Sequence, residues 1–285
     1  MVLYKYTTED SGFRILEDLR LKITPPNEFN DPFETTPHSK FTKKPEEMVE
    51  LVRTNPEYYR PVYKDMNREG AFTGTFEKFI GGLPKALIRH FTEYKKLSRE
   101  ELAKIDIRTP DTLSREMGIL CLSKTRSSIP MWSYYADHHR GVVFGFNIDK
   151  FGGPKYWHSG FVKYRKQRVV VNPYLPPASP DLKKFYYNTV FTKSAEWSHE
   201  QEYRRVFQLT DLASTRLANG QKMFYYLDIA GSAIEEIILG CRTSPDLESQ
   251  IRQELHRRKI TFGHIRLFRC IKHRSKYALG IIPSP

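Results

Sequence analysis

The stretch of sequence that decides the fold runs Lys193-Ser-Ala-Glu-Trp-Ser-His-Glu-Gln-Glu-Tyr-Arg-Arg-Val-Phe207, because it predicts a strand with two unlike faces. Side chains along a strand alternate between its faces, so Glu200, Glu202 and Arg204 are expected on one face. The opposite face would carry Tyr203, Arg205, Phe207 and Leu209. We therefore predict that the second face packs into a core and that the acidic face lines a cleft.

Two inequivalent carboxylates on one face suit chemistry at a sugar carbon. One carboxylate supports an oxocarbenium-like centre while the other handles a proton. The alternative interpretation is structural, because Glu and Arg on the same face of a strand commonly form a solvated ladder of cross-strand charges. Both interpretations of Glu200 and Glu202 stay open at this point.

Composition predicts a folded protein with a polyanionic partner. The chain has 285 residues, of which 39% are hydrophobic and 13% aromatic, enough for a sizeable core. Its 46 Lys and Arg against 33 Asp and Glu give a formal net charge of +13. Such a balance favours nucleic acid, phosphate-bearing cofactors or an acidic protein surface, although net charge also serves solubility.

Cysteine spacing and hydropathy indicate a reducing, aqueous compartment. Cys121, Cys241 and Cys270 are far apart and form no Cys-x-x-Cys pair, so neither a disulfide framework nor a thiolate zinc site is expected. The sequence opens on a strand-like segment without the pattern of a signal peptide, and no window resembles a membrane-spanning helix. We expect a cytoplasmic protein without membrane contact.

The order of elements predicts an α+β protein. Residues 3–7 and 21–24 are expected to be strands with a helix between them, and from residue 118 short strands dominate. Between residues 45 and 115 the apolar spacing is helical, and Ser98-x-x-Glu101 is typical of a helix N-terminus. We predict one domain spanning residues 1–285, with a helical insertion over 45–115.

Familiar catalytic signatures are absent from the sequence. It contains no Gly-x-Gly-x-x-Gly, no phosphate-binding loop, no His-Glu-x-x-His and no Gly-x-Ser-x-Gly. His138 and His139 are adjacent and lack the spaced partners of a metal site, so a surface or capping role is expected and no metal is predicted.

Three further groups of residues are candidates for binding. Ser123 ends a predicted strand, and Trp132, Tyr134 and Tyr135 follow in a short helix, where Trp132 suits core packing as well as a ligand contact. Asn30-Asp-Pro-Phe-Glu34 predicts a rigid turn that closes one wall of the site, unless Asn30 and Asp31 only form the turn. The basic candidates for nucleic-acid contact are Lys124, Arg126, Lys163, Arg165, Lys166 and Arg168.

The motifs occur in an order that resembles a widespread bacterial family named only as a domain of unknown function. Asn30-Asp-Pro-Phe-Glu34 comes first, then Met131-Trp132 with Tyr135-Ala136, then Glu196-Trp197. Glu200, Glu202, Tyr203 and Arg204 follow, and Ile237-Ile-Leu-Gly240 completes the pattern. The resemblance covers almost the whole chain and implies no activity.

The chain also resembles the ADP-ribosyltransferase superfamily more loosely, through its Tyr-Lys-Tyr-Thr strand, its strand ending in Ser and its late Glu-x-Glu. This resemblance implies two small, mainly antiparallel sheets around a cleft that binds NAD. It further implies that Glu202 holds the ribose hydroxyl and steadies the cation, while Glu200 orients the acceptor. The implied NAD contacts are Lys5 or Tyr6 at the ribose or diphosphate, Ser123 at the nicotinamide, and Tyr135 in stacking, with Trp132, Asn30 and Asp31 as further lining.

These expectations combine into one functional hypothesis and two rivals. The hypothesis is an NAD-dependent ADP-ribosyltransferase that acts as a bacterial toxin or phage-defence effector, with nucleic acid as a candidate acceptor and an antitoxin or inhibitor protein as a candidate partner. One rival is a nucleic-acid-binding module without catalysis, in which Glu200 and Glu202 merely pair with Arg204 and Arg205. The other is a metal-independent nuclease.

Overall fold

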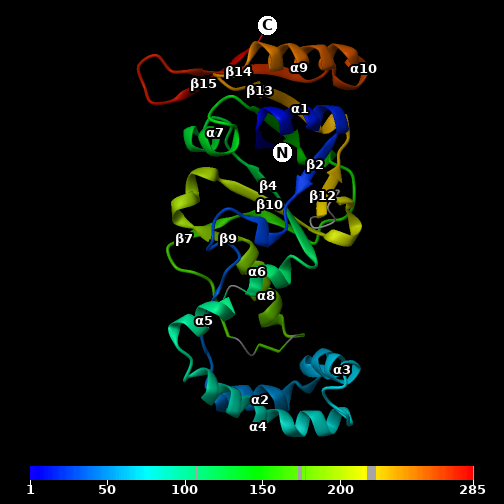
Figure 1. Cartoon of the computed structure of the whole chain (residues 1–285), viewed down its shortest axis with the longest axis vertical. Coiled ribbons are helices and arrows are strands. Elements are labelled where there is room, and N and C mark those ends of the chain that lie inside the picture. Colours follow the sequence, from blue (N-terminus) through cyan, green and yellow to red (C-terminus); the bar gives the residue numbers. More distant parts are fainter. Residues whose placement is uncertain (107, 173–174, 177, 217–222, 285) are drawn as a thin grey trace. The chain divides into compact units, whose positions relative to one another are not determined.

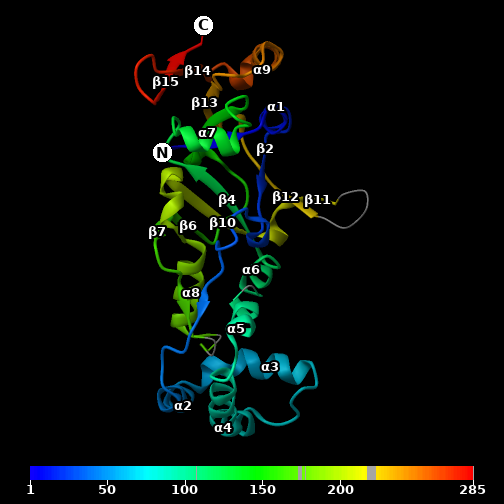
Figure 2. The same cartoon turned by 60° about the vertical axis from the view of Figure 1, so that its left-hand side comes forward.

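The computed structural model describes residues 1–106, 108–172, 175–176, 178–216 and 223–284 (Figures 1 and 2). The chain forms two compact units, each assembled from separate segments. The first unit contains Met1–Phe29, Leu113–Tyr164 and Ala195–Pro285. The second unit contains Asn30–Thr112 and Arg165–Ser194.

An eight-stranded sheet forms the centre of the first unit. Its strand order is β15-β14-β13-β5-β1-β4-β10-β6, and every neighbouring pair is antiparallel except β13 and β14. The parallel pair is joined by a helical crossover, as parallel strands require. The strands are β1 (Val2–Thr7), β4 (Met117–Ser123), β5 (Val142–Asn147), β6 (His158–Phe161), β10 (Glu202–Gln208), β13 (Ile234–Leu239), β14 (Arg266–Lys272) and β15 (Leu279–Pro283).

Helices cover this sheet, and a smaller antiparallel sheet of three strands stands beside it in the order β11-β12-β2. The helices α1 and α9 pack against each other (Figure 1). Both begin with a hydroxyl cap, Thr8 for α1 and Ser244 for α9. The elements are α1 (Glu9–Asp18), β2 (Arg20–Ile23), α7 (Ile129–Tyr135), β11 (Ala213–Arg216), β12 (Met223–Asp228), α9 (Pro245–Arg257) and α10 (Lys259–Phe262), with 3-10 turns η1 (Pro26–Glu28), η3 (Ile148–Lys150), η4 (Ala195–Glu200), η5 (Leu209–Asp211) and η6 (Gly231–Ala233).

The first unit has a main core and a smaller cluster. The main core includes Leu16 of α1, Phe144 of β5 and Ile251 of α9. The smaller cluster gathers Tyr6 and Trp132 with Ile238. The strand residues alternate between the two clusters, since successive side chains of a strand point to opposite faces.

The second unit is mainly helical. Its helices α2 and α4 lie side by side (Figure 2), and Val52, Phe79 and Leu87 are buried among them. Glu101 and Ser98 exchange hydrogen bonds of 2.8 and 3.2 Å, so the predicted capping box is confirmed. The elements are β3 (His38–Ser39), α2 (Pro45–Thr54), η2 (Pro56–Tyr59), α3 (Arg60–Arg68), α4 (Phe76–Tyr94), α5 (Arg99–Asp106), α6 (Arg108–Leu113), β8 (Val170–Val171) and α8 (Pro180–Val190), with β7 (Lys163–Arg165) and β9 (Thr192–Ser194) where the chain passes between units.

The predicted α+β class is confirmed, and the details differ in two ways. The large sheet has eight strands, more than the small sheets that were expected, because strands from the beginning, middle and end of the chain pair in it. The helical segment expected over 45–115 belongs to a unit that begins earlier, at Asn30, and also includes Arg165–Ser194. Within the described residues, no helix combines the length and apolar character needed to span a bilayer.

Gly141 gives a stability prediction for the first unit. A Cβ added there would lie 2.0 Å from the carbonyl oxygen of Thr7, so Gly141→Ala should force the backbone apart at a typical cost of about 1–3 kcal/mol. The control is Gly81→Ala in α4, where a Cβ meets no atom of the described structure within 4 Å. That change should stabilise the helix by about 0.5–1 kcal/mol. Calorimetric unfolding of both variants tests the pair, and an unchanged Tm for Gly141→Ala would contradict the close approach.

Candidate functional site

Glu200 is held at both its backbone and its side chain. It is the last residue of η4, and its carbonyl oxygen accepts a buried 2.6 Å hydrogen bond from Ser123 Oγ at the end of β4. Its Oε1 accepts a 2.7 Å hydrogen bond from the hydroxyl of Tyr135, at the end of α7. The residue is only 3% exposed. Three elements therefore fix the position of one carboxylate.

Gln201 separates the two carboxylates with an unusual backbone conformation. Its φ is +44°, a left-handed value that is uncommon outside glycine, and its carbonyl oxygen accepts a 3.0 Å hydrogen bond from Lys124 N. The expectation that Glu200 shares a strand face with Glu202 is wrong, because the strand begins only at Glu202. Strained backbone of this kind gathers at functional sites.

Glu202 forms a two-point ion pair with Arg204. Its two carboxylate oxygens accept hydrogen bonds of 2.8 Å from Nε and Nη2 of Arg204, which is 0% exposed. The guanidinium also lies 5.3 Å from the centre of the Phe29 ring, and Glu202 N donates to the hydroxyl of Tyr164 over 2.7 Å. The predicted pairing of Glu202 with Arg204 is confirmed, but the pair is buried and not a solvated ladder.

The other face of β10 packs as predicted. Tyr203, Phe207 and Leu209 belong to the main core of the first unit. Arg205 does not pair with Glu200 in the described contacts. Its guanidinium instead lies 4.6 Å from the ring centre of Tyr156, and the aromatic face stabilises its charge.

Lys5 lies within the sheet. Its ammonium donates a 3.1 Å hydrogen bond to the carbonyl oxygen of Cys121, and burial lowers the pKa of this ammonium. Attraction to Glu202 opposes that decrease. The described contacts of Lys5 are therefore those of a side chain that ties β1 to β4.

Tyr6 and Trp132 are core residues. Their rings meet edge to face at a centroid distance of 5.5 Å. The hydroxyl of Tyr6 donates to the carbonyl oxygen of Thr125 over 3.0 Å, and burial raises its pKa. The indole of Trp132 donates to the carbonyl oxygen of Arg126, also over 3.0 Å. The core-packing interpretation holds for Trp132, and Tyr6, which was expected to contact NAD, packs in the same cluster.

An aromatic group adjoins Glu200 in sequence. Tyr134 is 66% exposed, and its ring centre lies 6.3 Å from that of Trp197 and 6.5 Å from that of His199. His199 Nδ1 is 3.1 Å from the carbonyl oxygen of Glu196, which assigns the proton to Nδ1. Its Nε2 is buried and has no hydrogen-bond partner in the described part of the chain. Sequence reasoning missed His199, although it stands beside Glu200.

The Asn30–Glu34 turn belongs to the second unit, whereas Glu202 belongs to the first. Oδ1 of Asp31 accepts a 2.9 Å hydrogen bond from Phe33 N, which is the contact expected of a turn-forming side chain. Glu34 forms an ion pair of 3.3 Å with Lys193, and both side chains are almost fully buried. The turn-forming interpretation of Asp31 is confirmed.

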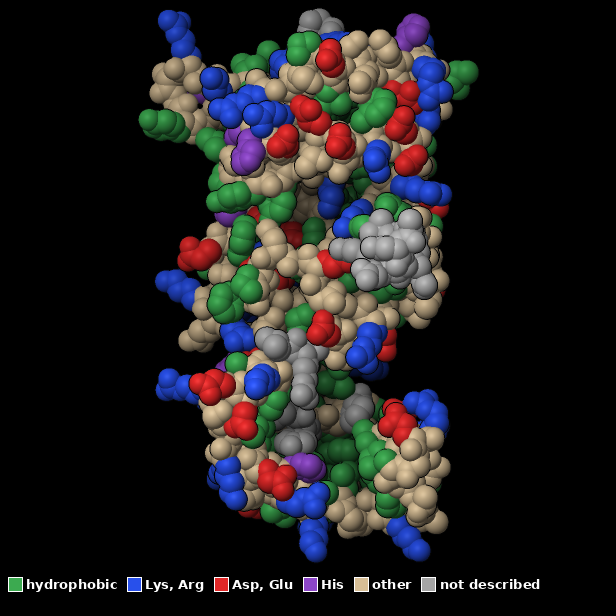
Figure 3. Space-filling model, viewed as in Figure 1, with side chains coloured by type: hydrophobic (Ala, Val, Ile, Leu, Met, Phe, Trp, Pro, Cys, Tyr) green, Lys and Arg blue, Asp and Glu red, His purple; other side chains and the backbone are tan. Residues whose placement is uncertain are grey.

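The six basic candidates divide between the units. In the first unit, Arg126 pairs with Glu236 over 2.8 Å, and Lys124 lies 6.0 Å from the ring centre of Phe161. The same unit contains Lys163, which is exposed. On the face drawn in Figure 3, Lys and Arg side chains are spread over the surface and interspersed with Asp and Glu. That face carries no single basic stripe.

The second unit contains the other three basic candidates. Arg168 is part of the framework, because it donates to the carbonyl oxygens of Thr36 and Pro37 over 3.0 and 2.7 Å. Arg165 and Lys166 are exposed, and neither forms an ion pair with the described residues. Of the six, Lys124, Lys163, Arg165 and Lys166 are exposed.

A cavity of about 560 Å³ in the first unit is also cationic. It is lined by His139, Arg242, Lys272, Lys276 and further residues of the β14–β15 turn. His139 follows two other residues with left-handed backbone and has a φ of +72°. Its Nε2 is 3.1 Å from Ser133 Oγ, and its pKa is lowered, first by burial and then by Arg242.

Comparisons with protein-family models, curated proteins and solved structures give no significant match to this chain. Among the described residues, no three His, Cys, Asp or Glu side chains converge on a common metal position. The function must therefore be argued from the contacts themselves.

The buried pair of Glu202 and Arg204 predicts strong coupling in stability. Glu202→Gln should cost about 3–5 kcal/mol, because it leaves a buried guanidinium without its charged partner. Arg204→Met alone should also destabilise, while the double variant should lose less than the sum of the two. Urea unfolding followed by circular dichroism measures the cycle. Additive losses would contradict the coupling.

The lowered pKa of His139 predicts that the stability of the protein depends on pH. The pKa of His139 is lower in the folded chain than in the unfolded chain, so protonation favours unfolding. The contribution of His139 to stability is therefore present above the ordinary histidine pKa. It is lost as the pH falls through the lowered pKa of the folded state. His139→Asn removes this titration while tolerating a positive φ. Its Tm should fall less than that of the unmodified chain between pH 7.5 and 5.5. Parallel pH profiles of Tm would disprove the assignment.

Proposed function

We propose that this protein is an NAD-dependent ADP-ribosyltransferase in which Glu200 is the carboxylate that supports the ribosyl cation. One observation carries the proposal: Glu200 is held by Tyr135 at its side chain and by Ser123 at its backbone. A carboxylate positioned in advance stabilises a developing cation without reorganising during the reaction. The role that the superfamily resemblance gave to Glu202 thus passes to Glu200, since Glu202 is bound to Arg204.

The proposed reaction needs few groups. The bond between C1′ of the ribose and the nicotinamide nitrogen breaks, and its electron pair goes to the nitrogen, so that nicotinamide leaves neutral. The acceptor then forms a bond to C1′ and loses its proton. His199 is proposed to take this proton, because Nδ1 faces the Glu196 carbonyl and Nε2 therefore carries the lone pair.

The aromatic group supports a planar ligand in the same region. Tyr134 exposes its ring next to Trp197 and His199, and such rings bind a nicotinamide or an adenine by stacking. Tyr134 directly precedes Tyr135, which binds the Glu200 carboxylate, and His199 directly precedes Glu200 itself.

The acceptor is proposed to be nucleic acid, with a toxin or defence role. The net charge of +13 favours a polyanion over a neutral acceptor. A toxin of this kind would need an antitoxin or inhibitor protein in its own cell. Cytoplasmic location belongs to the same proposal, because NAD and nucleic acid are both present there.

A metal-independent nuclease is the second candidate, and His199 is the observation that favours it. An imidazole with a free Nε2 lone pair beside a carboxylate suits general base catalysis at a phosphodiester. The two activities are separated by one condition, because a nuclease cuts nucleic acid without NAD.

Removing the Glu200 charge tests the proposal. Glu200→Gln should slow nicotinamide release from NAD by about a hundredfold or more, because the ribosyl cation loses its positioned counter-charge. Tyr135→Phe should slow the release less, since it keeps the ring and removes one hydrogen bond. The matched control is Glu17→Gln, an exposed carboxylate on α1 of the same unit, which should react at the wild-type rate.

Nicotinamide is quantified by chromatography, with circular dichroism to verify folding and a mass measurement on RNA, DNA and protein acceptors. No NAD cleavage by the unmodified protein with any acceptor would overturn the proposal. Unchanged cleavage by Glu200→Gln would remove its catalytic residue.

A further inference from the structure

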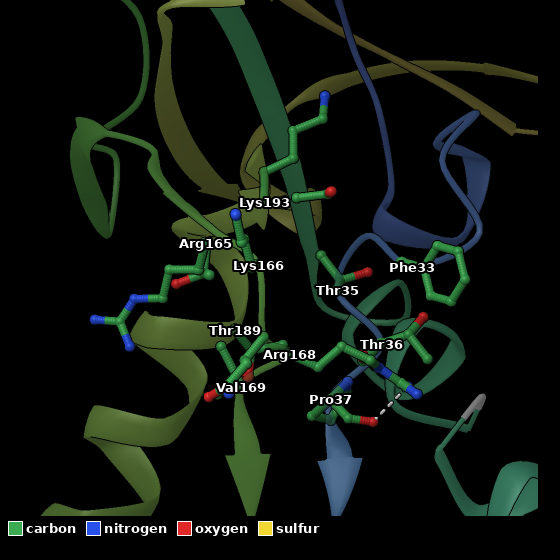
Figure 4. Close-up of a pocket in the computed structure, with 13 residues that line it drawn as sticks. Phe33, Thr35, Thr36, Pro37, Arg165, Lys166, Arg168, Val169, Thr189 and Lys193 are labelled. Carbon is green, nitrogen blue, oxygen red and sulfur yellow. Dashed lines mark hydrogen bonds between the residues drawn. The ribbon is translucent and has the colours of Figure 1, made fainter. Parts of the chain in front are cut away.

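The second unit contains a pocket of about 260 Å³ that the proposed NAD chemistry does not use (Figure 4). One wall is formed by Phe33 of the Asn30–Glu34 turn and by Thr35 and Thr36, which follow that turn. The basic segment 165–169 forms another wall. The remaining lining comes from Thr189 of α8 and from 192–194 in β9.

A buried donor without a partner points to a ligand. Thr189 is only 3% exposed, yet its Oγ1 forms no hydrogen bond with the described residues. A helical threonine commonly bonds the carbonyl of the preceding turn, so a free hydroxyl against a pocket is unusual. An oxygen-rich ligand would accept a hydrogen bond from it.

Backbone strain lies in the opposite wall. Thr35 has a φ of +54°, a left-handed conformation that is an outlier for a β-branched residue. Its hydroxyl donates to the carbonyl oxygen of Glu34 over 2.7 Å. Strain of this kind is retained where a fold positions groups for binding.

The charge of the pocket selects anions. Its lining includes Arg165, Lys166, Arg168 and Lys193, and none of the described lining residues is acidic. Arg168 is bound to backbone carbonyls, and Lys193 is paired with Glu34. The accessible charge therefore comes from Arg165 and Lys166. Phe33, which is 62% exposed, adds an aromatic surface to this pocket.

A second hollow continues the same surface. Residues 165–169 also line a neighbouring cavity of about 630 Å³, which Val170 and Asn188 complete. One basic segment therefore stands between two hollows. A single phosphate group would occupy only one of them, whereas a chain of nucleotides could reach both.

We propose that this pocket binds the phosphate of a nucleoside phosphate, either free or within a single strand of nucleic acid. Arg165 and Lys166 attract the phosphate, Thr189 donates a hydrogen bond to its oxygen, and Phe33 offers a ring on which the base stacks. The site lies in the second unit and requires no residue of the NAD site. A binding test of this site therefore gives a result that does not depend on the role of Glu200.

The test uses the full chain and two probes, a fluorescein-labelled single-stranded 12-nucleotide and AMP as a competitor. Arg165→Gln/Lys166→Gln should weaken oligonucleotide binding about tenfold or more. The log-log salt dependence should flatten by about 0.7 for each lost phosphate contact. The matched control, Lys272→Gln/Lys276→Gln, removes two exposed charges from the other cationic cavity and should bind as the unmodified chain does.

Thr189→Val distinguishes a role of the Thr189 hydroxyl in ligand binding from a role in stability. Removing an unpartnered buried hydroxyl should leave Tm unchanged or raise it, while affinity for the oligonucleotide falls several-fold. Competition by AMP would identify a free nucleotide as sufficient, and competition only by unlabelled oligonucleotide would identify a strand. Both results support the site.

Three results would overturn the inference: no binding of either probe, unchanged affinity in Arg165→Gln/Lys166→Gln, or loss of affinity only in the Lys272 and Lys276 control. The Glu200→Gln protein should bind the oligonucleotide normally. Failure of NAD cleavage would therefore not be mistaken for failure of this site.

Discussion

A buried hydrogen bond from Ser123 Oγ to the carbonyl oxygen of Glu200 joins the end of β4 to the residue two positions before β10. The 3-10 turn ends at Glu200, and β10 pairs with β4 from Glu202, which lies opposite Ser123. Because side chains alternate along a strand, a shift of one residue would turn Tyr203 out of the core and Glu202 into it. Core packing and carboxylate placement therefore depend on the same strand register.

The two carboxylates differ because their partners differ. The hydroxyl of Tyr135, a neutral group, donates a hydrogen bond to Glu200. Arg204 offers Glu202 a full positive charge in two-point geometry. A carboxylate held by a neutral donor can stabilise a developing cation, whereas one in a two-point ion pair mainly holds structure. Two residues separated by one position thus suit different tasks.

Features of the fold that depend on local sequence periodicity could be predicted from the sequence. Alternation along β10 predicted that Tyr203 and Phe207 are buried, and the spacing of Ser98 and Glu101 predicted the cap. The displaced position of Glu200 could not be predicted, because the left-handed Gln201 leaves no periodic signal. The Tyr135 contact joins positions 65 residues apart and depends on tertiary packing. Pairing in the eight-stranded sheet is nonlocal in the same way.

The segmented course of the chain has a consequence for its synthesis. Among the strands of the large sheet β1 is translated before the others, and its neighbours β5 and β4 are made more than a hundred residues later. The strand β1 therefore lacks these sheet neighbours while the whole of Asn30–Thr112 is translated. The second unit needs Arg165–Ser194 as well, so neither unit is complete until late in translation. Molecular chaperones that shield exposed strands would consequently matter more for this protein than for one whose domains emerge in succession.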